Sequence, residues 1–203
     1  MPTLRHLFGP SRKEIWQQLS REVDGHFVQG GFARSDKVQV HHGEWIVTLD
    51  TYAVSTGKAT MIFTRMRAPY VNPDGFRFTI YRRGLFSEIA KRFGMQDIEV
   101  GDPVFDRDFV IKGTDPLRVR MLLENPRIRE LISRQPEIHF SVKDDEGYFG
   151  PSFPAGVDEL YFNVMGVIKD VPRLKLLYDL FSETLDELCR IGSAYETAPD
   201  VNL

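Results

Sequence analysis

The chain has 203 residues, of which 42% are hydrophobic and 27% charged, with a formal net charge of -3 at pH 7. This mixture is typical of a chain that buries a core without disulfides or structural metals, and it excludes an intrinsically disordered protein. The single cysteine, Cys189, excludes an internal disulfide and favours a reducing compartment. The clearest uncharged apolar run, residues 160–168, is about half of a membrane span, and the first residues lack the apolar stretch of a secretory signal. We therefore expect a cytoplasmic protein without membrane contact.

The first predicted helix begins at SRKE, residues 11–14, which has the capping-box pattern. In this pattern Ser11 accepts a hydrogen bond from a free backbone N–H, and Glu14 reaches back to the cap. Apolar residues then recur with helical spacing until Gly25, at Ile15, Trp16, Leu19 and Val23.

The period changes to two between residues 37 and 82, where β-branched and aromatic residues are frequent. Turn residues at Gly43, in STG at 55–57 and in NPDG at 72–75 divide this region into four segments. We expect four strands in an antiparallel meander, each paired with the next along the chain.

The segment GDPVFDRDFVIKG, residues 101–113, places three aspartates within seven residues. We interpret it as a half-buried strand whose outer side carries Asp106 and Asp108, and whose inner side carries Phe105, Phe109 and Ile111. A short helix is predicted before it, over residues 85–93, with Gly94 as its stop.

Two helix starts follow, Asp115-Pro116 and Asn125-Pro126, because each places a capping side chain before a proline at the first helical position. Further strands and an acidic turn are expected between residues 136 and 168, and a long final helix begins near Pro172. The pattern predicts an α+β fold with antiparallel sheet and segregated helices. We expect one domain, or two subdomains over residues 1–95 and 96–192, with a frayed tail at 193–203.

Basic residues are concentrated between Lys58 and Arg92, which carry a net charge of +6. The meander predicts one basic surface for an anionic ligand or nucleic acid, formed by Arg65, Arg67, Arg77, Tyr81 and Arg83. The pI near 6.0 and the lack of a nucleic-acid motif disfavour nucleic acid. The alternative is a charged sheet surface that is offset by the acidic C-terminal part.

Asp106 and Asp108 are the only sequence support for a metal-dependent enzyme or hydrolase. Their spacing on a strand permits shared binding of a hard cation but does not impose it, and the alternative is a pair of solvated acids. The sequence contains no GxSxG, GxGxxG, GxxxxGK or HExxH motif. We predict no cofactor and favour a nonenzymatic protein.

Three aromatic residues lie in the Gly- and Pro-rich segment GYFGPSFPAG, residues 147–156. Because exposed connections often carry binding function, Tyr148, Phe149 and Phe153 are candidates for docking a partner. Alternatively, they fold back over the edge of the core.

Residues 101–132, GDPVFDRDFVIKGTDPLRVRMLLENPRIRELI, contain the pattern F-D-x-x-F-x-[IV]-x-G followed by an Asp-capped helix and an Asn-Pro break. This segment resembles a recurrent segment of uncharacterised bacterial proteins. The resemblance implies a bacterial origin and an α+β architecture, and it assigns no catalytic residues. We therefore expect a binding or accessory module for an unknown protein or small molecule, with a homo-oligomer left open.

Overall fold

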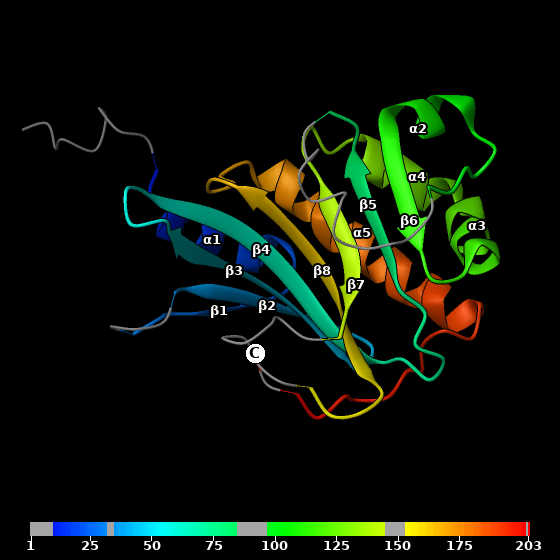
Figure 1. Cartoon of the computed structure of the whole chain (residues 1–203). Coiled ribbons are helices and arrows are strands. Elements are labelled where there is room, and N and C mark those ends of the chain that lie inside the picture. The colour runs from blue at the N-terminus through cyan, green and yellow to red at the C-terminus, as the bar shows by residue number, and fades with distance from the viewer. Residues whose placement is uncertain (1–9, 32–34, 85–96, 145–152, 202) are drawn as a thin grey trace, which may run out of the picture.

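The computed structural model describes residues 10–31, 35–84, 97–144, 153–201 and 203. These residues form one eight-stranded antiparallel sheet with five helices (Figure 1). The strands are β1 (His26–Val28), β2 (Lys37–His42), β3 (Trp45–Ser55), β4 (Thr60–Val71), β5 (Phe78–Arg82), β6 (Phe109–Gly113), β7 (His139–Lys143) and β8 (Val157–Met165). The helices are α1 (Arg12–Glu22), α2 (Pro103–Asp108), α3 (Pro116–Glu124), α4 (Pro126–Ser133) and α5 (Val171–Arg190). The predicted α+β fold with a long C-terminal helix is confirmed.

The strand order is β1-β2-β3-β4-β8-β7-β5-β6. The first four strands form a meander, but β5 pairs with β6 and β7 and not with β4. The predicted four-stranded meander is therefore wrong at its last strand, because β8 and β7 lie between β4 and β5. Strand pairs consequently join residues 1–95 to residues 96–192 within a single sheet.

A row of apolar residues that runs across the strands marks the face of the sheet that helices cover. The row has seven residues on seven strands, each directly opposite the next: Val38, Leu49, Met66, Phe162, Phe140, Ile80 and Ile111. All seven are at most 1% exposed. Phe140 contacts Phe181 of α5 edge-on, and α5 and α1 lie on this side of the sheet (Figure 1). Because successive strand residues point to opposite faces, the next residue on each strand faces away from the helices.

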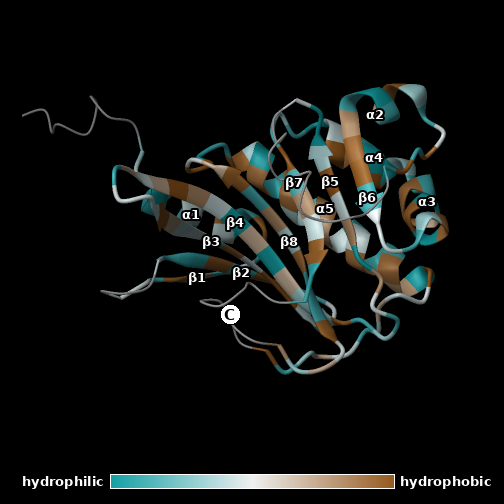
Figure 2. Cartoon of the chain, viewed as in Figure 1, coloured by the Kyte–Doolittle hydropathy of each residue, from teal (hydrophilic) through white to brown (hydrophobic). Residues whose placement is uncertain are grey.

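The helix starts follow from capping side chains. The capping box of Ser11 and Glu14 is present at α1, and Asp115 and Asn125 cap α3 and α4 as predicted. Asp170 caps α5 in the same way. Apolar residues recur along α5 and alternate with polar residues along β4, which Figure 2 shows by colour.

The interpretation of residues 103–108 as strand is wrong. Asp102 accepts hydrogen bonds from the backbone N–H groups of Val104 and Phe105, and this cap starts helix α2. The strand β6 begins only at Phe109, whose ring lies 4.6 Å from that of Phe105. A capping Asp before a proline at the first helical position therefore favours a helical turn over the extended pattern that the alternation suggested.

The C-terminal residues differ from the expected frayed tail. The N–H of Tyr195 donates to the carbonyl oxygen of Val71 at 3.2 Å, and Lys37 Nζ donates to the main-chain oxygen of Leu203 at 2.6 Å. The predicted helix over residues 85–93 lies outside the described residues. Among the residues that are described, no helix combines the length and apolar character needed to cross a bilayer.

Candidate binding face of the sheet

A second row of seven residues crosses the sheet beside the apolar row and points to the opposite face. Its members are Gln39, Thr48, Arg67, Tyr161, Ser141, Thr79 and Lys112, each directly opposite the next. We call this set the polar row, and the face that carries it the polar face. Seven consecutive strands thus contribute a polar residue to one line, because each strand alternates and the register aligns the alternation.

The middle of the polar row is buried. Thr48, Arg67, Tyr161 and Ser141 are each less than 5% exposed. Among the described residues, the hydroxyl of Ser141 has no hydrogen-bond partner, although it is out of contact with water. Leaving a buried hydroxyl unpaired costs about 1–3 kcal/mol, so the stability of the fold does not explain this group.

Two arginines and one aspartate form a compact charged group on β3 and β4. Asp50 lies directly opposite Arg65 and accepts two hydrogen bonds from it, at 2.8 Å from Nε and 2.8 Å from Nη2. Arg67 Nη2 donates to the same carboxylate at 2.7 Å. The guanidinium of Arg65 also lies 5.0 Å from the ring centroid of Tyr52. Carboxylate, aromatic ring and hydrogen bonds together hold the two guanidinium groups in one geometry.

A groove of about 1040 Å³ lies over this charged group on the polar face. Among the described residues, its lining contains three basic side chains, Lys37, Arg65 and Arg67, and one acidic side chain, Asp50. Its lining also includes Val28, Gln39, Ile46, Tyr52 and Leu203. The groove therefore brings charged side chains next to aromatic and aliphatic surface.

The other end of the polar face carries His139 of β7. Its ring stacks with that of Tyr81 at 6.5 Å and is 8% exposed. Burial, together with the charge of Lys143, lowers the pKa of His139 to about 4, although a hydrogen bond with Asn163 opposes this shift. The imidazole is therefore uncharged at neutral pH. The nearby Lys143 places its Nζ 3.2 Å from the ring centroid of Tyr161.

The structure divides the predicted anion-binding residues into separate places. Arg65, Arg67 and Tyr81 share the polar face, although Tyr81 is three strands from β4. Arg83 donates to the backbone oxygens of Asp106 and Arg107 at the end of α2. The prediction of a single basic surface is wrong, because that prediction required β5 to pair with β4.

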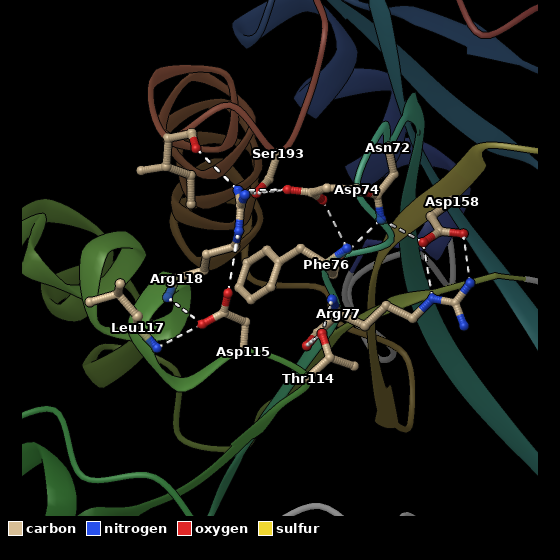
Figure 3. Close-up of polar contacts among 11 residues, drawn as sticks. Asn72, Asp74, Phe76, Arg77, Thr114, Asp115, Leu117, Arg118, Asp158 and Ser193 are labelled. Atoms are coloured by element: carbon tan, nitrogen blue, oxygen red, sulfur yellow. Dashed lines mark hydrogen bonds and ion pairs between the residues drawn. The ribbon is translucent and has the colours of Figure 1, made fainter.

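Arg77 belongs to a network that ties the turn before β5 to other elements (Figure 3). Its guanidinium binds the carboxylate of Asp158 at 3.0 and 3.2 Å, and Asn72 donates to the same carboxylate at 2.6 Å. On the other side of the turn, Asp74 pairs with Arg118 at 2.6 Å and accepts from Ser193 at 3.0 Å. Both acids are thus used in joining β8, α3 and the end of α5 to this turn.

The two candidate metal ligands, Asp106 and Asp108, have separate roles on α2. Asp106 accepts hydrogen bonds from the backbone N–H groups of Val100 and Gly101 at 2.9 and 3.0 Å. Asp108 pairs with Arg107 at 2.7 Å, and this contact lowers the pKa of Asp108. Within the described part of the chain, no group of three or more His, Cys, Asp or Glu side chains has the geometry of a metal site.

The candidate docking loop is described only in part. Tyr148 and Phe149 lie outside the described residues, and Phe153 is half-buried ahead of β8. Their role in docking a partner stays a prediction.

Sequence reasoning missed most of the polar row, namely Gln39, Thr48, Tyr161, Ser141, Thr79 and Lys112. Each strand shows the alternation that places a polar residue away from the core, and that signal was available. The alignment of these residues in one row depends on the strand order, and alternation within single strands does not predict that order. Comparison of the chain with protein-family models, with curated proteins and with solved structures finds no match.

Proposed function

We propose that the protein is a nonenzymatic binding module that takes an anionic ligand in the groove over β1–β4. The observation that carries this proposal is the set of three basic side chains along the groove, Lys37, Arg65 and Arg67. Arginine presents a planar set of donors that matches carboxylate and phosphate groups, and partial burial strengthens each such contact. The side chain of Arg65 is 14% exposed, so it lies at the boundary between the sheet and the groove.

The polar face favours binding over a role as a plain structural surface. Aromatic surface at Tyr52 and aliphatic surface at Ile46 lie in the same groove as the basic groups. Pockets of this mixed character are typical of small-molecule and peptide sites.

Citrate, a tricarboxylate, is a suitable probe for this proposal. We expect 10 mM citrate to raise the unfolding midpoint of the unaltered protein, because a ligand that binds only the folded state stabilises it by mass action. Arg65→Gln removes one groove guanidinium, while Arg67 still pairs with Asp50 at 2.7 Å, so the carboxylate keeps a partner. The variant is expected to lose most of the citrate-dependent shift in thermal denaturation.

The matched control is Lys58→Gln, which removes the same charge from the exposed turn between β3 and β4. Citrate also stabilises proteins generally by exclusion from their surfaces, so the comparison between the two variants is the measurement. Equal shifts in Arg65→Gln, Lys58→Gln and the unaltered protein would refute the proposed site.

A further inference from the structure

One edge of β3 is open beyond the point where β2 begins. β2 pairs with β3 from Trp45 to Leu49, and Val38 lies opposite Leu49 at the end of this pairing. Beyond that point β3 continues to Ser55 and, among the described strands, pairs only with β4. Because the backbone N–H and C=O groups of successive strand residues point to opposite sides, alternate residues between Asp50 and Ser55 direct these groups away from β4.

This open edge lacks the features by which proteins usually protect a free edge strand. Residues 51–57, TYAVSTG, contain no charged side chain and no proline. The pairing with β4 continues from Thr48 to Ser55 without a bulge. Ala53, Val54 and Ser55 are exposed. An exposed edge strand without charges, proline or bulges is a template for the addition of another strand.

The groove of about 1040 Å³ follows this edge. Four consecutive residues of β3, Asp50–Ala53, line it, and so do Gly30 and Gly31. No heavy atom of the described residues lies within 4 Å of the β-carbon position of Gly31. The groove therefore has space beside β3 for the main chain of one more strand, which lies about 4.7–4.9 Å from its neighbour in a sheet.

The strand register places the three basic side chains of the groove on one face of the sheet. Arg67 belongs to the polar row, and Arg65 is two residues from it on β4. Lys37 is two residues from Gln39, the member of the polar row on β2. Since side chains two residues apart on a strand share a face, Arg65 and Lys37 also point to the polar face. A strand added beside β3 would direct every second side chain to this basic face.

From this geometry we propose that the groove takes an acidic peptide segment of a partner protein, which pairs as an extra strand with residues 50–55 of β3. Main-chain hydrogen bonds to the open edge supply affinity, as in other cases of strand addition. Carboxylates at alternate positions of the peptide face Lys37, Arg65 and Arg67 and supply specificity. This inference rests on the proposed binding of anions in the groove, and it names the ligand class.

The probe is a fluorescein-labelled synthetic peptide of about eight residues in which glutamate alternates with threonine, a residue that favours strands. Fluorescence anisotropy with the full chain measures its binding. We expect a control peptide with glutamine in place of glutamate to bind at least tenfold more weakly. Arg65→Gln should weaken the glutamate peptide severalfold. Lys175→Gln, which removes the same charge from α5 on the helix-covered side of the sheet, should leave its affinity unchanged.

Hydrogen exchange distinguishes strand addition from attraction by charge alone. At a saturating concentration of the glutamate peptide, we expect alternate backbone amides between Asp50 and Ser55 to exchange at least tenfold more slowly, as measured by nuclear magnetic resonance. These are the amides whose N–H groups point away from β4. Amides between Trp45 and Leu49 that already pair with β2 are the internal control, and their exchange should not change.

Absence of binding, equal affinity of the two peptides, or unchanged exchange along residues 50–55 at saturation would overturn the inference. If citrate still stabilises the protein through Arg65 in any of these cases, only the peptide inference fails. If the glutamate peptide slows exchange along the edge but Arg65→Gln alters neither its affinity nor the citrate effect, the proposed anion site fails instead.

Discussion

Ser141 of β7 and Thr64 of β4 are two buried hydroxyl residues that differ in their hydrogen bonding. Thr64 donates to the carbonyl oxygen of Gly166 at 2.8 Å and accepts from the N–H of Ile168 at 2.9 Å. Within the part of the chain that the structure describes, Ser141 makes no hydrogen bond. A hydroxyl that is both donor and acceptor stabilises the fold, and an unpaired one costs free energy. The burial of the Ser141 hydroxyl on the polar face therefore does not stabilise the fold.

The two hydroxyls give a matched pair of variants. We expect Ser141→Ala to leave the free energy of unfolding unchanged or to raise it by up to about 1 kcal/mol, because it removes an unpaired group. Thr64→Val should lower the free energy of unfolding by about 2 kcal/mol, because it leaves the Ile168 N–H without an acceptor. Urea denaturation measures both, and a large loss in Ser141→Ala would show that the hydroxyl is paired in solution.

His139 makes the stability depend on pH. Its pKa is about 4 in the folded protein and 6.5 for the ordinary side chain, so the unfolded chain binds the proton more tightly. The contribution of the uncharged His139 to the free energy of unfolding is complete above pH 6.5 and is lost as the pH falls toward 4. The difference between pH 7.5 and pH 4.5 is about 2.5 kcal/mol.

The test is urea denaturation of His139→Asn at these two pH values. The asparagine has no titrating group, so we expect the difference in the free energy of unfolding between pH 7.5 and 4.5 to be smaller by about 2.5 kcal/mol than in the unaltered protein. Carboxylates that titrate in this range contribute equally to both proteins. An unchanged difference would show that His139 is exposed to solvent.

At the scale of elements, α3 closes against the end of β6 at Gly113. A β-carbon at this position would lie 2.5 Å from Cγ2 of Val119 and 3.2 Å from the carbonyl oxygen of Arg77. The close approach lets α3 follow β6 after only a short connection and brings Thr114 to the backbone of Arg77, where its N–H donates at 2.9 Å. Glycine is thus required here by packing.

Gly113→Ala should therefore lower the free energy of unfolding by about 1–3 kcal/mol, as expected for overpacking at a close contact. Gly31→Ala is the control, since no heavy atom of the described residues lies within 4 Å of its β-carbon position. We expect thermal denaturation to show a clear loss for Gly113→Ala and almost none for Gly31→Ala. Equal effects would mean that α3 moves freely away from β6.

At the scale of the whole molecule, strands from both halves of the chain share one sheet and one core. β8 pairs with β4, β7 pairs with β5, and Phe181 of α5 is fully buried against Phe140. Both tryptophans, Trp16 and Trp45, lie in the first half. This arrangement favours unfolding as one cooperative unit.

Phe181→Ala tests this cooperativity, because it removes core volume from the second half. We expect a loss of about 3–5 kcal/mol in the free energy of unfolding. Tryptophan fluorescence and far-ultraviolet circular dichroism should report the same lower midpoint in urea. A fluorescence midpoint that stays in place while the dichroism midpoint falls would divide the molecule into two subdomains.

Local patterns predicted much of the fold. The caps at Ser11, Asp115 and Asn125 placed three helix starts, because capping hydrogen bonds are made within a few residues. Asp102 carries the same Asp-Pro signal, whereas the alternation of Phe105, Phe109 and Ile111 predicts a strand over the same residues. The cap at Asp102 prevails, so the strand predicted at α2 is wrong, and Asp106 and Asp108 lie on a helix.

The sequence by itself determined which residues of each strand are apolar and which are polar, since this alternation follows from the chemistry of neighbouring side chains. Only the tertiary structure decided that β8 and β7 lie between β4 and β5, which aligned seven polar residues and brought the C-terminal segment beside Lys37. The physical reason is that backbone N–H and C=O groups are the same in every strand, so they allow many pairings. Burial of the complete apolar face against α1 and α5 selects among those pairings, and that selection involves the whole chain at once.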